Sequence, residues 1–248
     1  VVLEHGAQAH IVVRIDEGIS LSQEIRHTLH VSVGASARCT LLTINAAGQR
    51  ARVTVAQTGS VEEGGVLRWQ NVSLGGSHLE HSLVSRAIGA HAESAVDWMF
   101  YAKGTEKQHL HVRNIFEAAE GSGEVLMRGV AEGQGHAIAK GMIDIGLHGN
   151  GTNTYLTQQV LMLDATSKVD AVPALEIKTN DVKASHSATV ARVTPEDLFY
   201  FAARGISTIE ARAMFVQGFL GDIVSRIEPN LQEEVQGVIG KKYERVSS

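Results

Sequence analysis

Cysteine, proline and aromatic residues are all scarce in this chain of 248 residues, which has one cysteine, three prolines and 5% aromatic residues. The single cysteine, Cys39, excludes an internal disulfide and any zinc or iron–sulfur site made of four thiolates from one chain. A secreted module held together by disulfides is therefore excluded. Because Cys39 lies within a strand-like run, we expect it to be a buried structural thiol rather than a reactive one.

Long hydrophobic runs and an excess of positive charge are also missing. No apolar stretch approaches the ~20 residues that a membrane-spanning helix requires, and the first residues carry no signal-peptide pattern. The formal net charge is −5, which argues against binding nucleic acid through its phosphates. We therefore expect a cytoplasmic protein that binds neither membranes nor nucleic acid.

Apolar and polar residues alternate from Ala9 to about Val193, as they do in β-strands. Residues 10–15, 28–33, 52–55 and 140–145 are examples, and glycine-rich turns separate such runs. A Gly-Ala-x-Ala turn occurs twice, at 34–37 and at 89–92. Short strands, tight corners and no intervening helices are typical of a β-solenoid, but a β-sandwich shows them too. The pattern alone leaves both folds open.

After Val193 the period of the sequence becomes helical. Thr194 to Asp197 predicts a capped helix start with proline at its first position, and Gly205 is a plausible stop. Ser207 to Glu210 reads as a capping box that opens a second helix. Further helical pattern covers 222–227, and a last amphipathic segment covers 231–243. We therefore expect a β region over 1–193 and a helical region over 194–248, which packs on the β region or on a partner.

Histidine is abundant, with twelve residues, and invites a search for a metal site. His109 and His111 share one face of a predicted strand, and with His136 they define an alternative function, a metal-dependent β-solenoid enzyme. The pairs His27/His30 and His78/His81 are expected to be solvent-facing polar positions. No His-Glu-x-x-His motif, nucleophile elbow or Walker A loop is present, so no common catalytic signature supports an enzyme.

The most distinctive stretch runs from Pro173 to Val190 and reads PALEIKTNDVKASHSATV. Phe199-Tyr200, Arg204-Gly205-Ile206-Ser207 and Gly218-Phe219-Leu220 follow it in order. From about Lys103 to Leu220 the chain resembles the SufB/SufD family of iron–sulfur cluster assembly proteins. This resemblance implies a mostly β fold, a right-handed parallel β-helix followed by a small C-terminal helical subdomain, and it favours the solenoid over the sandwich.

The resemblance also implies a function and partners. The chain would be a non-catalytic scaffold subunit that pairs through its β-helix, as a homodimer or as a heterodimer with a SufB-like subunit. Its C-terminal helices would dock a SufC-like ABC ATPase, which fits the missing Walker motif. No cofactor is expected to bind stably, although a transient iron–sulfur cluster would form at the complex. A further alternative is a structural interaction module that has lost cluster chemistry.

At the level of residues, the resemblance assigns His186 to the interface where clusters form, as a metal ligand of the imidazole type. Gln158 and Ala184 stand where family members carry cysteines, and Ser187 stands where the SufB type has glutamate. These departures place the chain on the SufD side. A sulfur-bearing thiolate would therefore come mainly from a partner.

The residues expected to dock the ATPase lie in the predicted helices, where exposed aromatic side chains suit helix-in-groove contact. They are Leu198, Phe199, Tyr200, Arg204, Gly205, Phe215, Gly218 and Phe219. Their spacing is equally consistent with internal packing. Family members typically carry a further region before the β-helix, whereas strand pattern here begins near Ala9.

Overall fold

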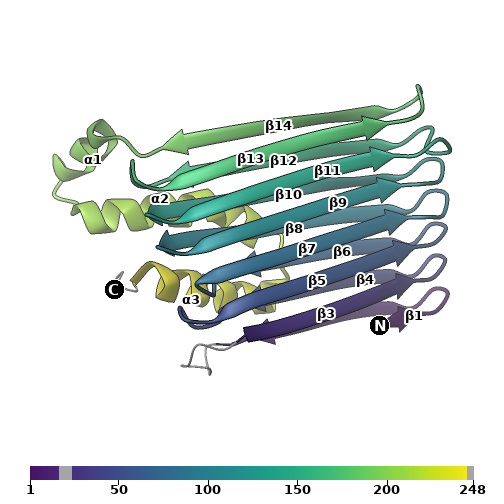
Figure 1. The fold of residues 1–248 in the computed structure, drawn as a ribbon, viewed down its shortest axis with the longest axis horizontal. Coiled ribbons are helices and arrows are strands. Elements are labelled where there is room, and N and C mark those ends of the chain that lie inside the picture. Colours follow the sequence, from purple (N-terminus) through teal and green to yellow (C-terminus); the bar gives the residue numbers. More distant parts are fainter. Residues whose placement is uncertain (17–23, 245–248) are drawn as a thin grey trace.

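The computed structural model describes residues 1–16 and 24–244, which form fourteen strands followed by three helices (Figure 1). In chain order the elements are β1 Val2–Leu3, β2 Gln8–Ile15, β3 Glu24–Val33, β4 Arg38–Asn45, β5 Arg52–Val61, β6 Val66–Ser73, β7 His78–Ala87, β8 Glu93–Gly104, β9 Lys107–Phe116, β10 Ser122–Gly133, β11 His136–Ile145, β12 Asn153–Met162, β13 Lys168–Ile177, β14 Lys183–Arg192, α1 Pro195–Ala202, α2 Thr208–Val224 and α3 Pro229–Glu244.

The strands alternate between two parallel sheets. The odd-numbered strands form one sheet in the order β1-β3-β5-β7-β9-β11-β13, and the even-numbered strands form the other in the order β14-β12-β10-β8-β6-β4-β2. Each strand pairs in parallel with the strand one turn away, as β10 does with β12. This topology is a β-solenoid, which confirms the mostly β fold class and excludes the antiparallel sandwich.

The interior of the solenoid follows from the alternation of residues along each strand. In β9 the buried positions are Gln108, Leu110, Val112, Asn114 and Phe116, and the residues between them face outward. Large rings fill the space between the sheets, among them the fully buried Trp69 and Trp98. Gly129 leaves room for another ring, that of Phe100, because a Cβ at position 129 would lie 2.0 Å from it.

The corners that lead from an odd-numbered strand to the next even-numbered strand share one backbone conformation. All of them except the corner between β13 and β14 contain one residue in a left-handed conformation: Gly6, Ser36, Gly64, His91, Glu120 and Gly151. The amide of each donates a hydrogen bond to a carbonyl in the corner of the next turn, for example Ser36 N to Glu63 O at 2.9 Å. The repeated Gly-Ala-x-Ala turns are two of these corners, with Ser36 and His91 at the x position. Residues other than glycine accept this conformation at a cost that the stacked hydrogen bonds offset.

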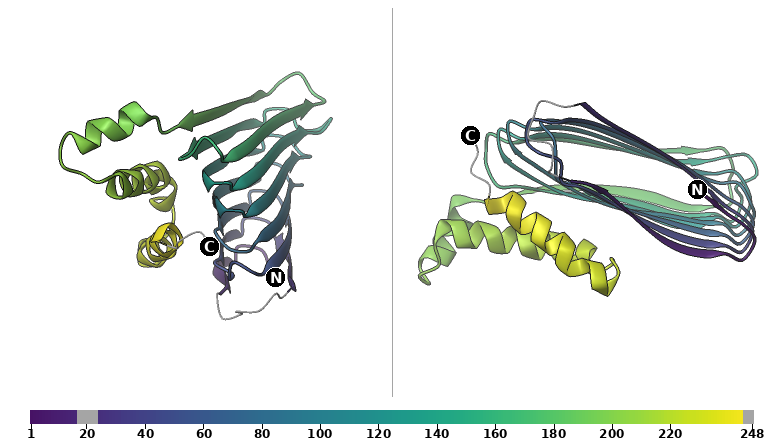
Figure 2. Two further views of the ribbon diagram at one scale, coloured as in Figure 1. Left: turned by 60° about the vertical axis from the view of Figure 1, so that its left-hand side comes forward. Right: turned by 90° about the horizontal axis from the view of Figure 1, so that it is seen from below.

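The helices cover the outer face of the even-numbered sheet and leave the odd-numbered sheet bare (Figure 2). Side chains of α2 and α3, such as Leu220 and Ile239, pack on outward-facing sheet residues such as Met99 and Val130. No residue of α1 is buried. The expected packing of the helical region on the β region is therefore confirmed for α2 and α3.

The helix boundaries confirm most of the capping predictions. Thr194 and Ser207 both close capping boxes, with Asp197 and Glu210 respectively, and Gly205 has a φ of +78° just beyond α1. Two details differ. The helical pattern over 222–227 extends beyond α2, which ends at Val224. The last helix, α3, begins at Pro229 rather than at 231, because proline fits the first position of a helix.

Candidate functional site

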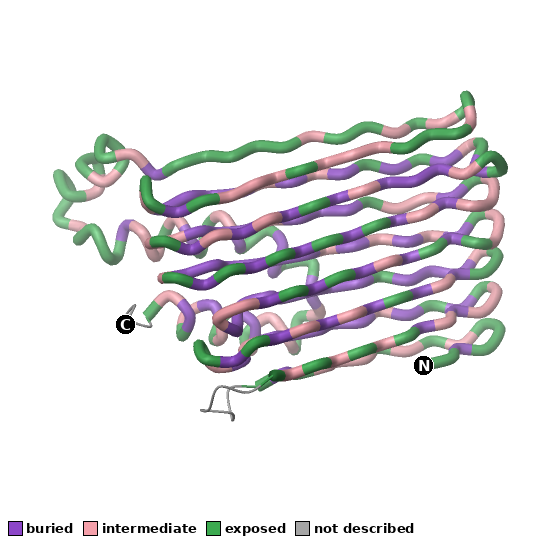
Figure 3. Tube along the Cα trace, viewed as in Figure 1, coloured by how far each residue is buried: buried purple, intermediate pink, exposed green. Residues whose placement is uncertain are grey.

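His186 lies on the last strand of the even-numbered sheet, at the open end of the solenoid. β14 pairs with β12, β13 pairs with β11, and no described strand continues either sheet beyond them. His186 is in register with Leu156, which is fully buried inside the solenoid. Its side chain therefore belongs to the inward-facing set, yet it is exposed because no described turn covers it. Figure 3 shows that most of the strand β14 is exposed.

The other positions singled out by the resemblance gather near the same end. Ala184 belongs to the same inward-facing set and packs against the interior core. Gln158 lies one strand deeper, about 8 Å from His186 as judged from strand spacing and rise. Its Nε2 donates to Ala139 O at 3.1 Å, and the side chain is buried. Histidine, alanine and glutamine thus converge at the open end, and the only one that carries a metal-binding nitrogen is His186.

Cys39 takes no part in this end of the molecule. It is buried in β4 between Ala9 and Leu67, which confirms the expected structural thiol. Burial raises the pKa of the thiol, so the reactive thiolate is disfavoured. Five strand steps separate β4 from β14 in the even-numbered sheet, which corresponds to about 24 Å.

The strand histidines do not form a common ligand set. His109 and His111 are both exposed on the outer face of β9, as expected, but His136 pairs instead with Asp170, Nε2 to Oδ2 at 2.9 Å. In register, His136 lies beside Lys107 rather than beside either histidine. Within residues 1–16 and 24–244, no group of three or more His, Cys, Asp or Glu side chains is arranged to hold a metal ion.

The prediction that both members of each spaced histidine pair face solvent is wrong for His81 and also for His27, which is half-buried and in register with the interior residue Val55. Residues three apart on a strand point to opposite faces, so His78 faces outward and His81 lies inside the solenoid. His81 Nε2 bonds Gln57 Oε1 at 3.0 Å, and its ring packs on Trp98 with centroids 4.3 Å apart. Burial lowers the pKa of His81 to about 3, with a smaller contribution from His27.

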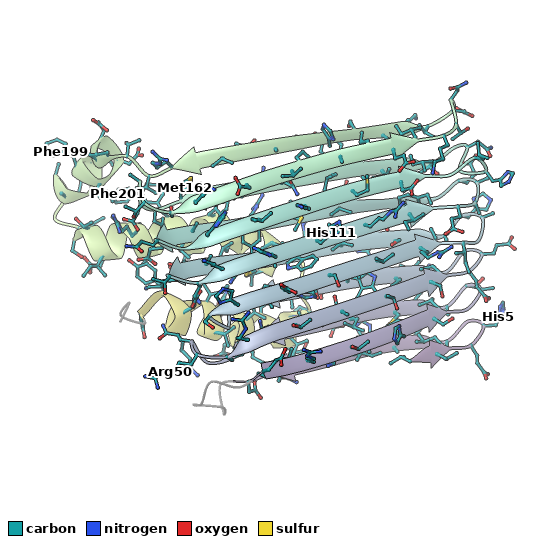
Figure 4. All side chains as sticks on the ribbon, viewed as in Figure 1. His5, Arg50, His111, Met162, Phe199 and Phe201 are labelled. Carbon is teal, nitrogen blue, oxygen red and sulfur yellow. The ribbon has the colours of Figure 1, made fainter. Side chains whose placement is uncertain are left out.

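The predicted docking residues of α1 form an exposed aromatic tip. Phe199 and Tyr200 are 74% and 55% exposed, and Figure 4 shows Phe199 at the end of the molecule farthest from the solenoid corners near His5. Arg204 stacks on the Tyr200 ring at 3.5 Å and donates to the Tyr200 carbonyl at 3.0 Å. Leu198 turns inward and packs beside the apolar cluster under the helices. Gly205 then lets the chain reverse toward α2.

The predicted docking residues of α2 serve mainly internal packing. Phe215 packs against Phe201, with ring centroids 5.4 Å apart, and Phe219 lies under the Arg128 guanidinium at 5.5 Å. Gly218 lines a shallow hollow beside Arg128 and has open space where a Cβ would stand.

Two exposed apolar residues of α2, Ile209 and Met214, were missed by the sequence reasoning, with exposures of 71% and 49%. Both residues lie outside the apolar stripe of α2 that Val216, Leu220 and Ile223 define, and this position in the helical pattern could have indicated their exposure. With Phe199 and Tyr200 they are the exposed large apolar residues of the helical region, and we call these four residues the α1–α2 tip. None of the described helices is long and apolar enough to cross a membrane.

Comparison with known proteins places this architecture in a family. Residues 1–219 match the family model described as SUF system FeS cluster assembly, SufBD core domain. An iron–sulfur cluster assembly SufBD family protein of Mycobacterium tuberculosis is 31% identical over 74% of this chain and 48% of its own length. A protein of the same description from Mycobacterium leprae is 24% identical over 98% of this chain and 28% of its own length.

The iron–sulfur cluster assembly protein SufD of Escherichia coli is also similar, with 27% identity over 68% of this chain and 40% of its own length. The chain thus spans less than half the length of each of these three relatives. The family model nevertheless covers the whole solenoid and most of α2. The resemblance inferred from the motif series is confirmed, and the chain belongs to the SufBD family of the SUF iron–sulfur cluster assembly system.

Proposed function

We propose that this chain is a non-catalytic scaffold subunit of an iron–sulfur cluster assembly complex, which pairs through the open end of its solenoid. The observation that carries the proposal is the exposed last turn, formed by β13 and β14. Ile177 and Val190, in register with the buried interior residues Ile145 and Val160, are 42% and 49% exposed there, beside the outer edges of β13 and β14, which pair with no described strand. Such an edge invites pairing with another strand, because pairing satisfies its amides and carbonyls and covers apolar surface.

The partner at this end is a second copy or a SufB-like subunit. Pairing would bring His186 against the partner and enclose it in the joint between the two solenoids. The imidazole could then ligate iron during assembly, with the cluster as transient cargo rather than a resident cofactor. Because Cys39 is buried about 24 Å away, any thiolate would come from the partner.

The α1–α2 tip is the surface that we assign to an ABC-type ATPase. Aromatic and aliphatic side chains held in the open by a short capped helix provide large contact area at low entropic cost. Within the predicted set, Phe199 and Tyr200 would make the contact, whereas Phe215 and Phe219 would support it from below. ATP hydrolysis would belong to the partner.

A pairing assay tests the open end. Ala188→Lys places an ammonium group in the inward-facing set of β14, and we expect it to abolish the dimer, or the complex with a SufB-like subunit, in sedimentation velocity. The matched control is Lys140→Ala on the bare odd-numbered sheet, which should leave pairing intact. A complex that forms normally with Ala188→Lys would contradict the proposed interface.

A reconstitution assay tests His186 separately. In an anaerobic reconstitution of the complex with iron and sulfide, His186→Ala should retain pairing and lose most of the cluster absorbance. Unchanged cluster formation would instead favour a structural interaction module without cluster chemistry.

A pull-down tests the α1–α2 tip. Phe199→Ala combined with Tyr200→Ala should remove the ATPase from the complex while dimerisation persists. Lys140→Ala again serves as the control. Retention of the ATPase by the double variant would reject the tip as the docking surface.

A further inference from the structure

Lys242, near the end of α3, forms a buried ion pair with Glu106, in the corner between β8 and β9. Its Nζ lies 2.5 Å from both carboxylate oxygens, and the two side chains are 2% and 6% exposed. Glu106 also accepts a hydrogen bond from the Lys103 amide at 3.0 Å, which holds the carboxylate in the corner. We call Lys242 and Glu106 the latch pair.

Further polar groups surround the latch pair. Lys103 Nζ donates to the carbonyl oxygen of Tyr243 and lies 3.4 Å from the Glu132 carboxylate. The Tyr101 hydroxyl donates to the same carboxylate. Two ammonium groups thus face two carboxylates, so the charges balance. These groups come from β8, β10, the β8–β9 corner and the end of α3, which ties the C-terminal helix to two successive turns of the solenoid.

Burial works against both charges of the latch pair. Desolvation raises the pKa of Glu106 and lowers the pKa of Lys242, and the attraction between the two groups acts in the opposite direction. A buried ion pair of this kind adds little net stability, because desolvation offsets the attraction, but removal of one partner leaves an uncompensated charge. The pair therefore favours one docked position of α3 over intermediate positions in which a single charge would stay buried.

The helices and the interior of the solenoid are packed separately. The interior cluster and the cluster under the helices share no buried residue. In the part of the chain that the structure describes, no backbone-to-backbone hydrogen bond joins α1, α2 or α3 to a strand. Side chains make the connection, through apolar packing and through hydrogen bonds from Gln70, Arg128 and Lys103 to carbonyl oxygens of the helical region. Ion pairs add to it: His10–Glu228, Arg14–Glu234, Asp97–Arg226, Arg128–Asp222, Asp164–Arg212 and Glu106–Lys242.

We propose that the latch pair makes the docking of α2 and α3 on the even-numbered sheet an all-or-none conformational switch within this chain. In the closed state the pair is buried and the outer apolar face of the sheet is covered. In the open state both ions return to water together, the helices leave as one unit, and residues such as Leu42, Met99 and Leu126 are uncovered. The solenoid remains folded in both states. This inference goes beyond the scaffold function and does not depend on an ATPase.

Hydrogen exchange of the purified chain, followed by mass spectrometry of peptides, tests the latch. Glu106→Gln keeps an acceptor for the Lys103 amide but leaves Lys242 without a counter-charge, and Lys242→Met leaves Glu106 without its closest cation. We expect each single variant to accelerate exchange in α3 and α2 at least tenfold, with exchange in β9 and β11 unchanged. The double variant Glu106→Gln/Lys242→Met buries no unpaired charge, so its exchange should return to within threefold of the wild-type rate.

The matched control is Glu117→Gln, which breaks the exposed ion pair between Glu117 and Arg86 and should change exchange in neither region. The proposal is overturned if the single variants leave exchange in α3 at the wild-type rate, or if the double variant exchanges as fast as the singles. It is also overturned if β9 and β11 accelerate by the same factor as α3. Because no partner protein is present, failure here would leave the proposed scaffold function untouched.

Discussion

The two apolar clusters of the molecule are held together by different means. The cluster inside the solenoid contains rings such as Trp69, Trp98 and Phe100, and its walls are strands joined by continuous parallel hydrogen-bond ladders. The cluster under the helices is mostly aliphatic, and side chains alone connect its two sides. The comparison teaches that the solenoid supplies the fold, whereas the helices are a docked layer that can be perturbed separately.

Trp98→Ala is the strongest way to break the interior. Trp98 is fully buried, and its Nε1 donates to Ser73 Oγ at 3.0 Å. The substitution leaves a large cavity and removes one of the two partners of the Ser73 hydroxyl, so we expect the free energy of unfolding to fall by about 3–5 kcal/mol. Far-UV circular dichroism in denaturant measures the change. Phe199→Ala, on a side chain that is 74% exposed, should stay within about 0.5 kcal/mol of wild type.

Leu220→Ala tests the packing of the cluster under the helices. Leu220 is 1% exposed between α2 and the even-numbered sheet, so its truncation should weaken docking by about 2–4 kcal/mol. We expect the helices to undock at a lower denaturant concentration than the strands unfold, which appears as two transitions in helix and strand signals. A single transition shared by both signals would show that the two layers are one cooperative unit.

Acid should weaken the interior through His81. Its pKa is about 3 in the fold and about 6.5 in an unfolded chain, so below pH 6.5 the unfolded state binds more protons. The stability associated with neutral His81 is complete above pH 6.5 and is lost as the pH falls toward 3. At pH 5 the loss is about 2 kcal/mol. The free energy of unfolding of His81→Gln should fall less between pH 7 and pH 5 than that of wild type. An equal fall in both proteins would contradict the assignment.

The bare face of the odd-numbered sheet should be the least sensitive. Arg86 and Glu117 form an ion pair at 2.7 Å, but their side chains are 53% and 35% exposed. Glu117→Gln should therefore change the free energy of unfolding by about 0.5 kcal/mol or less. Measuring the free energy of unfolding of wild type and variant in low and high salt checks this. A difference between the two proteins that persists in high salt would indicate a contact beyond the ion pair.

Local patterns predicted much of the fold. Alternating residues marked the strands, and capping residues placed the starts of α1 and α2, because both signals act over a few residues. The motif series from Pro173 to Leu220 identified the family. Local patterns did not reveal that Ser36 and His91 adopt left-handed conformations, since the hydrogen bonds that hold them come from the next turn.

The candidate sites were predictable to a smaller extent. The sequence named His186, Phe199 and Tyr200, but it did not separate them from residues such as Phe215 that pack internally. Only the exposure of each side chain in the folded protein separates the two groups. That exposure depends on which strands or helices cover the residue. The inward orientation of His81 was open to prediction, because a spacing of three on a strand always joins opposite faces.

The amino-acid sequence by itself determined the strand period, the starts of the first two helices and the family. Only the tertiary structure decided that His186 is exposed at the end of the solenoid while Leu156, one turn below, is buried. It also brought together Glu106 and Lys242, which are 136 residues apart. The physical reason is that period and capping depend on neighbours in the chain, whereas burial and ion pairing depend on which turns and helices stack upon one another.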